Sequence, residues 1–369
     1  MDLRILADDL TGALDTAAAF EGEVPVYFDG PPAEGAAMAA APVQAIATPT
    51  RDVSPAELPA HLGPALAWLA GAGIAFKKVD SLLRGNTLAE VLLAARAGGF
   101  EKIIFAPAFP RQGRFTLDGR LVLAADAPGT ERPSVREALA GAGIAVEVPD
   151  VRSDADLQAV ADGVCAQGAQ RWLWCGSAGL GHALAHTLGR AARMPEAMAG
   201  AGRQPLLLVS ASHHEVTRRQ WTSLLGSLPP RPADASHPPP IVARAGDAAE
   251  LRAALAAMQS PFDTALLDLA PRERLTPAEA AALLAEQLPA IVHQAPRPGV
   301  LAVVGGDTLL GLCRASGARG LLASAAQRTG WGQARWIGGP WDGVVCHSRS
   351  GAFGSDEDLT EVVAALRGG

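Results

Sequence analysis

Two neighbouring aspartates, Asp8 and Asp9, directly follow a short apolar run near the N-terminus, and Thr11 and Gly12 come just after them. Two carboxylates at the end of a strand offer a general base or an anchor for Mg²⁺. Adjacent side chains on a strand point to opposite faces, so we expect one of the two to face a ligand. The alternative is structural, with Asp9 or Thr11 capping the free amides of the next helix.

A second polar segment, residues 77–86, follows another apolar run and leads into a helical pattern. Its polar side chains, with one glycine in the turn, are Lys77, Lys78, Asp80, Ser81, Arg84, Gly85 and Asn86. Cations, a hydroxyl and an amide in one turn suit a hydroxycarboxylate, because arginine binds a carboxylate through two parallel hydrogen bonds. A charged surface turn in which Asn86 caps the next helix is the alternative.

Lysine is rare in this chain, since Lys77, Lys78 and Lys102 are the only lysines among 31 lysines and arginines. The abundance of Ala, Arg, Gly and Pro indicates a genome biased toward G and C, so the scarcity alone reflects coding. Lys77 and Lys78 gain interest from their place after a strand and close to Arg84.

Two further turns of the first half follow predicted strands. Residues 106–116 form a long turn that brings Arg111 and Arg114 near the same sheet edge. Residues 176–180 form a turn of small residues whose backbone amides could hold an anion. A plain solvent loop explains each of these turns equally well.

The second half contains two glycine-rich turns, Gly305-Gly306-Asp307-Thr308 after a strand and Ser350–Gly354 near the C-terminus. Glycine lets the backbone approach a phosphate, and Asp or Thr can meet Mg²⁺ or a ribose. Two such turns in one domain favour a nucleotide site. The chain has neither GxxxxGK[ST] nor a GxGxxG after its first strand, which excludes a P-loop protein and disfavours a dinucleotide-dependent dehydrogenase.

Two other groups of residues give weaker signals. His182 and His186 share one face of a helical pattern, but no third metal ligand has a clear spacing. Ser212 precedes His213 and His214 without the G-x-S-x-G pattern of a hydrolase nucleophile. A metal-dependent aldolase or a hydrolase is therefore a minor alternative.

Short apolar runs alternate with Ala/Leu-rich helical patterns along the chain. The runs predict buried strands at Leu3–Ala7, Val24–Phe28, Val43–Ala47, Ile74–Lys78, Ile103–Ala106, Trp172–Cys175, Leu206–Val209, Thr264–Leu269 and Val300–Val304. Helices are predicted at Asn86–Ala97, Asp154–Gln167, Ala248–Met258 and Pro277–His293. This alternation predicts α/β layers with mostly parallel sheets. Such sheets bind ligands at the carboxyl ends of their strands, so residues that follow strands carry most weight.

Length and composition narrow the class of protein. The 369 residues suggest two domains, and a composition shift over Arg193–Gln204 marks the boundary, with a Pro-rich surface loop at Leu228–Pro240. A hydrophobic content of 49% with 19% charged residues excludes wholesale disorder. The net charge of −7 argues against a nucleic-acid partner, which would need a basic stripe.

The cysteines and the N-terminus indicate the compartment. Cys165, Cys175, Cys313 and Cys346 lack redox or metal spacing and are expected to be buried thiols in a reducing compartment. Charges interrupt the first apolar run too early for a signal peptide, and no uncharged apolar stretch of 18 residues predicts a membrane span. We therefore expect a cytoplasmic protein without membrane contact. Its Pro-rich loops and several tryptophans are compatible with a homodimer.

Together these motifs resemble the four-carbon acid sugar kinase family. The matching segments keep the family's order and comprise residues 7–16, 77–86, 106–110, 113–114, 176–180, 216–220, 305–308 and 350–354. The resemblance implies an ATP- and Mg²⁺-dependent kinase of four-carbon sugar acids such as threonate, erythronate or oxo-tetronates. It also implies that residues 1–203 bind the sugar acid and residues 204–369 bind the nucleotide, with the active site in the cleft between two α/β domains.

The resemblance also implies roles for single residues, position by position. The implied catalytic residues are Asp8, Asp9, Lys78 and Asp80. The residues implied to bind the acid are Ser81, Arg84, Gly85, Asn86 and Arg114. The residues implied to bind the nucleotide are Ser212, Gly305, Gly306, Asp307, Thr308, Gly351 and Gly354.

This chain departs from the family's pattern mainly in the nucleotide half. Leu82 stands in place of a threonine, His213 and His214 in place of small residues, Arg349 in place of a lysine and Ala352 in place of a glycine. Alanine adopts a positive φ only at a cost. These departures imply a weaker nucleotide site, and a non-catalytic protein that binds small carboxylates is the main alternative.

Overall fold

The predicted strands all form, with ends that differ from the prediction by at most one residue. The computed structural model describes residues 2–32, 40–127, 129–168, 171–193, 204–228, 239–244, 247–258, 264–271, 273, 275–326, 328 and 330–367. The four predicted helices form as well, with ends within two residues of the prediction. Hydrophobic periodicity therefore sufficed to identify the main layers.

The chain divides into two compact units. The N-terminal unit comprises residues 1–194 and 322–325, and the C-terminal unit comprises residues 195–321 and 326–369. The predicted boundary after residue 203 falls within residues 194–203, which lie outside the described residues. Most of the Pro-rich loop predicted at Leu228–Pro240 also lies outside them.

The N-terminal unit is built on a parallel sheet in the order β2-β3-β1-β4-β9-β5-β8. Its strands are β1 (Leu3–Ala7), β2 (Val24–Phe28), β3 (Val43–Ala47), β4 (Ile74–Lys78), β5 (Lys102–Ala106), β8 (Ala145–Glu147) and β9 (Trp172–Gly176). A separate antiparallel pair is formed by β6 (Arg114–Leu117) and β7 (Arg120–Leu123). The predicted long turn at 106–116 therefore ends in a strand.

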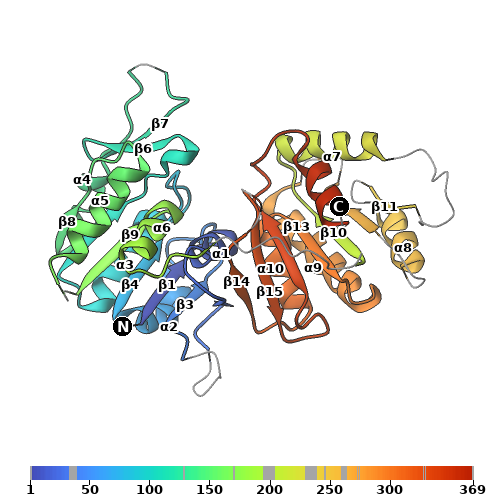
Figure 1. Ribbon diagram of the computed structural model, residues 1–369, viewed down its shortest axis with the longest axis horizontal. Coiled ribbons are helices and arrows are strands. Elements are labelled where there is room, and N and C mark those ends of the chain that lie inside the picture. The colour runs from blue at the N-terminus through green and yellow to red at the C-terminus, as the bar shows by residue number, and fades with distance from the viewer. Residues whose placement is uncertain are drawn as a thin grey trace. The chain divides into compact units, whose positions relative to one another are not determined.

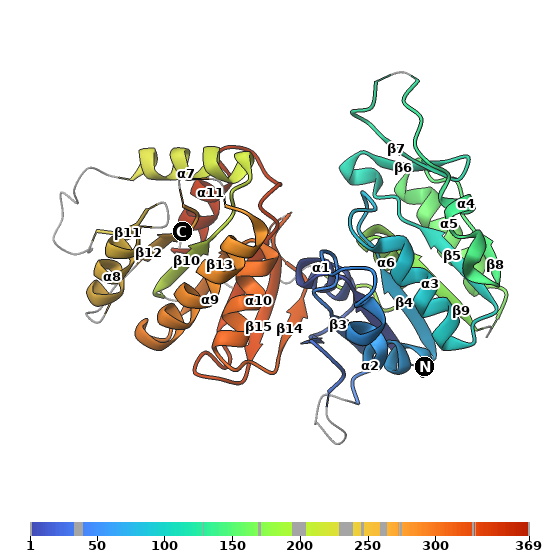
Figure 2. The ribbon, with the colours of Figure 1, turned by 180° about the vertical axis from the view of Figure 1, so that it is seen from behind.

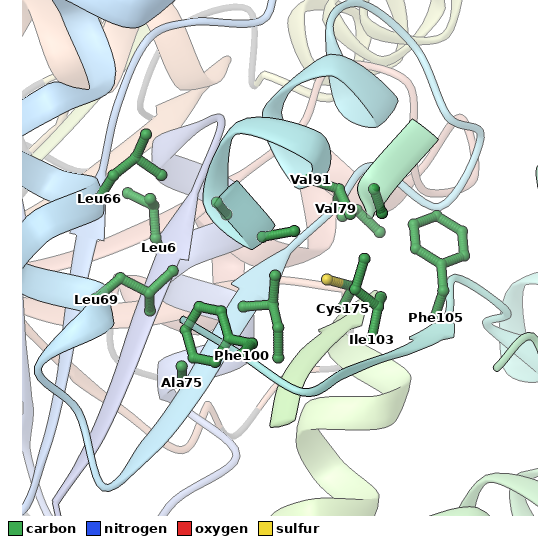
Figure 3. Packing of buried hydrophobic residues seen from close by; sticks show 14 of the residues in the cluster. Leu6, Leu66, Leu69, Ala75, Val79, Val91, Phe100, Ile103, Phe105 and Cys175 are labelled. Carbon is green, nitrogen blue, oxygen red and sulfur yellow. The ribbon is translucent and has the colours of Figure 1, made fainter. Parts of the chain in front are cut away.

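Helices cover both faces of this sheet, as Figures 1 and 2 show. The helices are α1 (Leu10–Ala17), α2 (Leu58–Ala70), α3 (Thr87–Gly98), α4 (Val135–Ala138), α5 (Asp154–Cys165) and α6 (Ala178–Thr187), with short 3₁₀ turns at Pro110–Gln112 and Ala140–Ala142. Helices α2 and α3 pack together on one face, and α1, α5 and α6 pack on the other. Figure 3 shows the core under α2 and α3, where Leu66 and Val91 meet strand residues such as Leu6 and Ile103.

The C-terminal unit repeats the α/β plan. Its strands are β10 (Leu206–Ser210), β11 (Ile241–Ala243), β12 (Thr264–Asp268), β13 (Val300–Val304), β15 (Gly332–Ile337) and β16 (Val345–Arg349). They follow the order β11-β12-β10-β13-β16-β15, parallel from β11 to β16, with β15 antiparallel to β16. Strand β14 (Gly320–Ser324) is divided, since residues 320–321 belong to this unit and residues 322–324 to the N-terminal unit.

Helices again flank this second sheet. They are α7 (Glu215–Ser227), α8 (Ala248–Ala257), α9 (Pro277–Gln294), α10 (Gly306–Ala315) and α11 (Asp358–Leu366). Helices α7 and α11 pack against each other, and α9 packs against α8 and α10. Trp221 of α7 and Leu359 of α11 close a core over Leu208 of β10. The predicted fold class of mostly parallel sheets flanked by helices is confirmed.

The four cysteines differ in how far they are buried. Cys175, Cys313 and Cys346 are buried, as predicted, whereas Cys165 at the end of α5 is half-buried, so the prediction for this residue was wrong. Its place in the last turn of a surface helix leaves one side open. No helix among the described residues has both the length and the hydropathy needed to cross a membrane.

Candidate functional site

Three segments of the N-terminal unit start at one edge of its sheet. Strands β3, β1 and β4 are neighbours, and Ala7 pairs in register with Ala47 of β3 and with Lys78 of β4. Parallel strands in register end together, so the chain leaves all three at the same edge. The segments concerned are residues 8–12, 48–53 and 79–86.

Arg51 binds three carboxylates at this edge. Its Nε donates to Asp8 Oδ2 at 2.9 Å, and its Nη2 lies 3.2 Å from Asp9 Oδ1 and 3.7 Å from Asp80 Oδ1. Burial alone would lower the pKa of Arg51, but the charges of these aspartates raise it above its ordinary value. Sequence reasoning missed Arg51. Its position shortly after β3 was the available signal, since residues that follow strands were given most weight.

Asp9 combines a structural contact with a place in the charged cluster. As the N-cap of α1 it accepts from the Gly12 amide at 3.1 Å and from Thr11 Oγ1 at 2.7 Å. Burial alone would raise the pKa of Asp9, but the charges of Lys78 and Arg51 and the Thr11 hydroxyl hold it below its ordinary value. The capping alternative is therefore realised, and the carboxylate stays ionised as well.

Asp8 offers an acceptor that no described residue uses. The residue is 2% exposed, and its Oδ1 has no hydrogen-bond partner although Oδ2 binds Arg51. A buried carboxylate oxygen without a donor is unfavourable, so a ligand hydroxyl that donates to it would gain binding energy. Strand alternation predicted that Asp8 and Asp9 point apart, but one planar guanidinium reaches both through separate nitrogen atoms.

The two lysines of β4 have opposite surroundings. Lys77 is 1% exposed and its Nζ lies 2.8 Å from Glu90 of α3. Burial alone would lower the pKa of Lys77, but Glu90 and Asp8 raise it above its ordinary value. Lys78 is 6% exposed, and the structure shows no hydrogen bond or ion pair for its Nζ within the described part of the chain. The pair therefore divides into a structural lysine and an available one.

Asp80 organises the turn that follows β4. Its Oδ2 accepts from the amides of Leu82 and Arg84, both at 3.1 Å, and its carboxylate binds the Arg84 side chain at 2.7 and 2.9 Å. Burial opposes ionisation, but Arg84 holds the pKa of Asp80 well below its ordinary range. These contacts let Asp80 position the turn after β4, and its predicted catalytic role stays a prediction. They also occupy the edge of Arg84 that was predicted to bind a carboxylate.

Gly85 and Asn86 hold the segment that carries Arg51. The Asn86 amide donates to the carbonyls of Thr50 at 2.9 Å and Val53 at 2.7 Å. Gly85 has a φ of 63°, and a Cβ atom there would collide with the Arg51 carbonyl. These two residues therefore fix the segment that carries Arg51, and their predicted role in binding the acid stays a prediction.

The remaining predicted contributors in this unit also have protein partners. Arg114 Nη1 donates to Ser81 Oγ, which brings these two predicted acid-binding residues together. Arg111 pairs with Asp154 at 2.6 Å on the surface. Ser177 caps α6 and donates to the Ala108 carbonyl at 2.6 Å, as in a plain tight turn.

Three segments of the C-terminal unit likewise start at one sheet edge. Strands β10, β13 and β16 are neighbours, and Val304 pairs in register with Ser210 of β10 and with Arg349 of β16. The segments that leave this edge are residues 211–214, 305–308 and 350–354. The residues predicted to bind a nucleotide therefore come together.

The first turn of α10 has the features of a phosphate site. Gly305 is its N-cap with a φ of 110°, and its amide donates to the Arg349 carbonyl at 2.9 Å. Gly306 opens the helix, Asp307 is exposed and Thr308 is buried. A helix N-terminus carries a partial positive charge and unpaired amides, both of which attract phosphate.

Helix α7 fixes the C-terminal glycine loop. Thr217 Oγ1 donates to the Gly351 carbonyl at 2.7 Å, and Gln220 Nε2 donates to the Phe353 carbonyl at 3.0 Å. A Cβ atom on Gly351 would collide with Ser212 Oγ. The close approach that Gly351 permits is thus to Ser212, and the two loops form one packed group.

Comparisons with known proteins found related sequences over both units of the chain. A family model described as a sugar-binding N-terminal domain matches residues 3–133. A D-threonate kinase of Bordetella bronchiseptica is 29% identical over 414 aligned positions, covering 99% of this chain and 97% of that protein. A D-threonate kinase of Cupriavidus necator is 38% identical over 125 positions, covering 32% of this chain and 29% of that protein.

Together these matches support the four-carbon acid sugar kinase family for this chain. A solved protein of Salmonella typhimurium LT2 shares the fold, with a TM-score of 0.71 and 16% identity over 98% of both chains. The match to the Bordetella bronchiseptica protein extends over both units of this chain, as the ordered motifs do.

Arg349, which stands where the family usually keeps a lysine, is buried in the C-terminal unit. Its guanidinium donates to Gln220 Oε1 and to the Phe353 carbonyl, lies 3.0 Å from Asp358 Oδ2 and stacks 5.1 Å from the centre of the Trp331 ring. A Cβ atom on Gly354 would lie 2.6 Å from this guanidinium, so Gly354 makes room for the ion pair. Burial lowers the pKa of Arg349 despite Asp358.

Replacing Arg349 by lysine is expected to lower the free energy of unfolding by about 2 kcal/mol or more, because one ammonium cannot keep all these partners. Urea unfolding measures the loss. The matched control is Arg219→Lys, in an exposed pair with Asp356, which should change stability by less than about 0.5 kcal/mol. An equal effect of the two substitutions would contradict a structural role of Arg349.

Two other departures are accommodated without strain. Ala352 is absent from the few described non-glycine residues with positive φ, which are Asp29, Leu83 and Asp118, so the predicted cost of an alanine does not arise. His214 caps α7, since its Nδ1 accepts from the Val216 amide at 3.3 Å. Ser212 Oγ accepts from the His214 amide at 3.3 Å, a contact that does not activate a nucleophile.

The metal alternative gains no support. Within the described residues, no three His, Cys, Asp or Glu side chains are grouped so that they could hold a metal ion. Burial lowers the pKa of His182, and Asp15 opposes that shift. Mg²⁺ bound to a nucleotide needs only one or two protein carboxylates, so Asp307 at the start of α10 is compatible with it.

Proposed function

We propose that this protein is an ATP-dependent kinase that phosphorylates a hydroxyl of a four-carbon sugar acid, with D-threonate as the first candidate. The observation that carries the proposal is the cluster in which Arg51 joins Asp8, Asp9 and Asp80 beside the unpaired Lys78. Relatives named D-threonate kinase support this substrate.

In the proposed reaction the acceptor hydroxyl donates to Asp8 Oδ1 or to Asp9. The hydroxyl oxygen forms a bond to the γ-phosphorus as the bond to the bridging oxygen breaks, and ADP leaves with that electron pair. The hydroxyl proton passes to the carboxylate. Catalysis of such transfers depends chiefly on positioning and on charge neutralisation, which a rigid ionic cluster provides.

The nucleotide is proposed to bind the loops at the edge of β10, β13 and β16. The first turn of α10 would hold phosphate through its amides, and Mg²⁺ bound with the nucleotide would neutralise phosphate charge. Arg218 and Arg349, which are close to these loops, are paired with Asp268 and Asp358. This pairing favours the second candidate, a protein that binds small carboxylates without catalysis.

ADP release with ATP, Mg²⁺ and a panel of four-carbon acids tests the proposal. Release that depends on D-threonate or a close relative is expected. Release no faster than without acid, from folded protein, would contradict it. Calorimetry then separates the candidates, because a non-catalytic protein would bind an acid but neither ATP nor ADP.

A further inference from the structure

We infer that Lys78 and the first turn of α1 form an oxyanion site that holds the phosphoryl group during transfer; this inference rests on the proposed kinase function. The site lies within the N-terminal unit. It differs from the phosphate-binding turn of α10, which would hold the nucleotide before transfer.

Lys78 is buried without a direct contact to an acceptor. The residue is 6% exposed, and no described residue hydrogen-bonds to its Nζ or forms an ion pair with it, although the charges of Asp9 and Asp15 act on it from a longer distance. The other cations of the cluster differ, since Lys77 pairs with Glu90 and Arg51 with three aspartates. An anion that touched Lys78 Nζ directly would therefore stabilise this buried ammonium beyond what Asp9 and Asp15 do from a distance.

Lys78 faces the first turn of helix α1. A Cβ atom on Gly12 would lie 2.5 Å from Lys78 Nζ and closer still to Asp9 Oδ1. Gly12 lies in the first turn of the eight-residue helix α1, whose N-terminus carries a partial positive charge. The ammonium and the positive end of the helix therefore face each other. Asp9 offsets part of this repulsion, and a bound oxyanion would offset more.

The Asp9 carboxylate and the Lys78 ammonium lie close enough for one bound group to reach both. During transfer the acceptor oxygen is bonded to phosphorus, so the phosphoryl oxygens are two bonds from the oxygen that a carboxylate deprotonates. Asp9 Oδ1 and Lys78 Nζ are separated only by the space above Gly12. An acceptor at Asp9 would bring a phosphoryl oxygen to Lys78. A lysine suits one such oxygen, because its charge is compact.

Transfer of the phosphoryl group forms one bond and breaks one. The oxygen–phosphorus bond to the acceptor forms, the bond to ADP breaks, and the acceptor proton goes to the carboxylate. Lys78 keeps its protons throughout and, together with the partial positive charge at the start of α1, neutralises charge on the phosphoryl oxygens.

The test is binding without nucleotide, measured by calorimetry with D-threonate and with threonate 4-phosphate. Gly12→Ala places a methyl group between Asp9 and Lys78, so it should weaken the phosphate ester by about tenfold or more and the acid by less than about threefold. Lys78→Met should show the same selectivity. Gly163→Ala in α5 is the matched control, because its Cβ would meet nothing within 4 Å.

Equal weakening of acid and ester would overturn the inference and assign the site to the acid's carboxylate. No weakening of either ligand in Lys78→Met would overturn it too. Circular dichroism establishes that each variant is folded. A failure of the proposed function is seen separately, as absence of acid-dependent ADP release by the wild type, whereas this test needs no turnover.

Discussion

Lys78→Arg is expected to lower the turnover number at least about 100-fold while the fold survives. The Nζ atom of Lys78 lies against Gly12 in a space that admits no further methyl group. A guanidinium is larger and planar, so it must displace the first turn of α1 or withdraw from it. Steady-state ADP release with the best acid measures the loss, and urea unfolding shows that stability remains.

The control for this substitution is Lys102→Arg. Lys102 is half-buried beside Glu147 and lies 5.2 Å from the centre of the Trp172 ring, contacts that an arginine keeps. The control should retain the wild-type turnover number. Wild-type turnover by Lys78→Arg as well would show that the position needs only a positive charge, and the proposed role of a compact ammonium would be wrong.

Arg51→Ala is expected to destabilise the protein by about 3–5 kcal/mol near pH 7 and to abolish turnover. The substitution removes the cation that Asp8 and Asp80 share, and these residues are only 2% and 5% exposed. Asp80 keeps Arg84, whereas Asp8 loses its hydrogen-bond donor. Equilibrium unfolding in urea gives the first effect, and ADP release gives the second. Arg84→Ala is the comparison, since Arg84 is half exposed and Asp80 would keep its backbone donors.

The pH dependence gives Arg51→Ala a distinct signature. In the wild type the pKa values of Asp9 and Asp80 lie below their ordinary values, so their stabilisation is present above the unfolded pKa of about 3.9 and is lost as pH falls through the folded values. Without Arg51 the folded pKa values rise, and protons enter the fold at higher pH. The stability deficit should therefore shrink as pH falls from 7 toward 4. A constant deficit would contradict the electrostatic cause.

The layers of the fold were predictable, because buried strands such as Leu3–Ala7 and Val300–Val304 are continuous apolar runs between helical patterns. The short strands β6, β7, β8 and β11 were missed because three or four residues carry too little periodicity. Strands β14, β15 and β16 were missed because polar residues and glycine interrupt their five or six residues. Motifs next to strands identified Asp8, Asp9 and Lys78. Partner choice was not predictable: sequence order does not show that Arg84 would bind Asp80 or that Arg349 would turn inward to Asp358.

Arg51 could not be predicted from the sequence for a related reason. Its chemistry depends on the register of β1, β3 and β4, which brings residues 8, 51 and 80 together across three crossovers. Local spacing cannot convey that contact. Lys77 and Lys78 were separable in principle, since alternation along β4 must send one of them to each face of the sheet.

Asn86 binds the segment after β3 through main-chain carbonyls rather than through side chains. These hydrogen bonds therefore do not depend on which side chains the segment carries. An exposed residue of the segment such as Asp52 can therefore be exchanged while the loop keeps its shape, whereas a change at Gly85 or Asn86 releases the whole segment. Substrate preference can thus evolve by substitutions around Arg51 without rebuilding the scaffold that holds it.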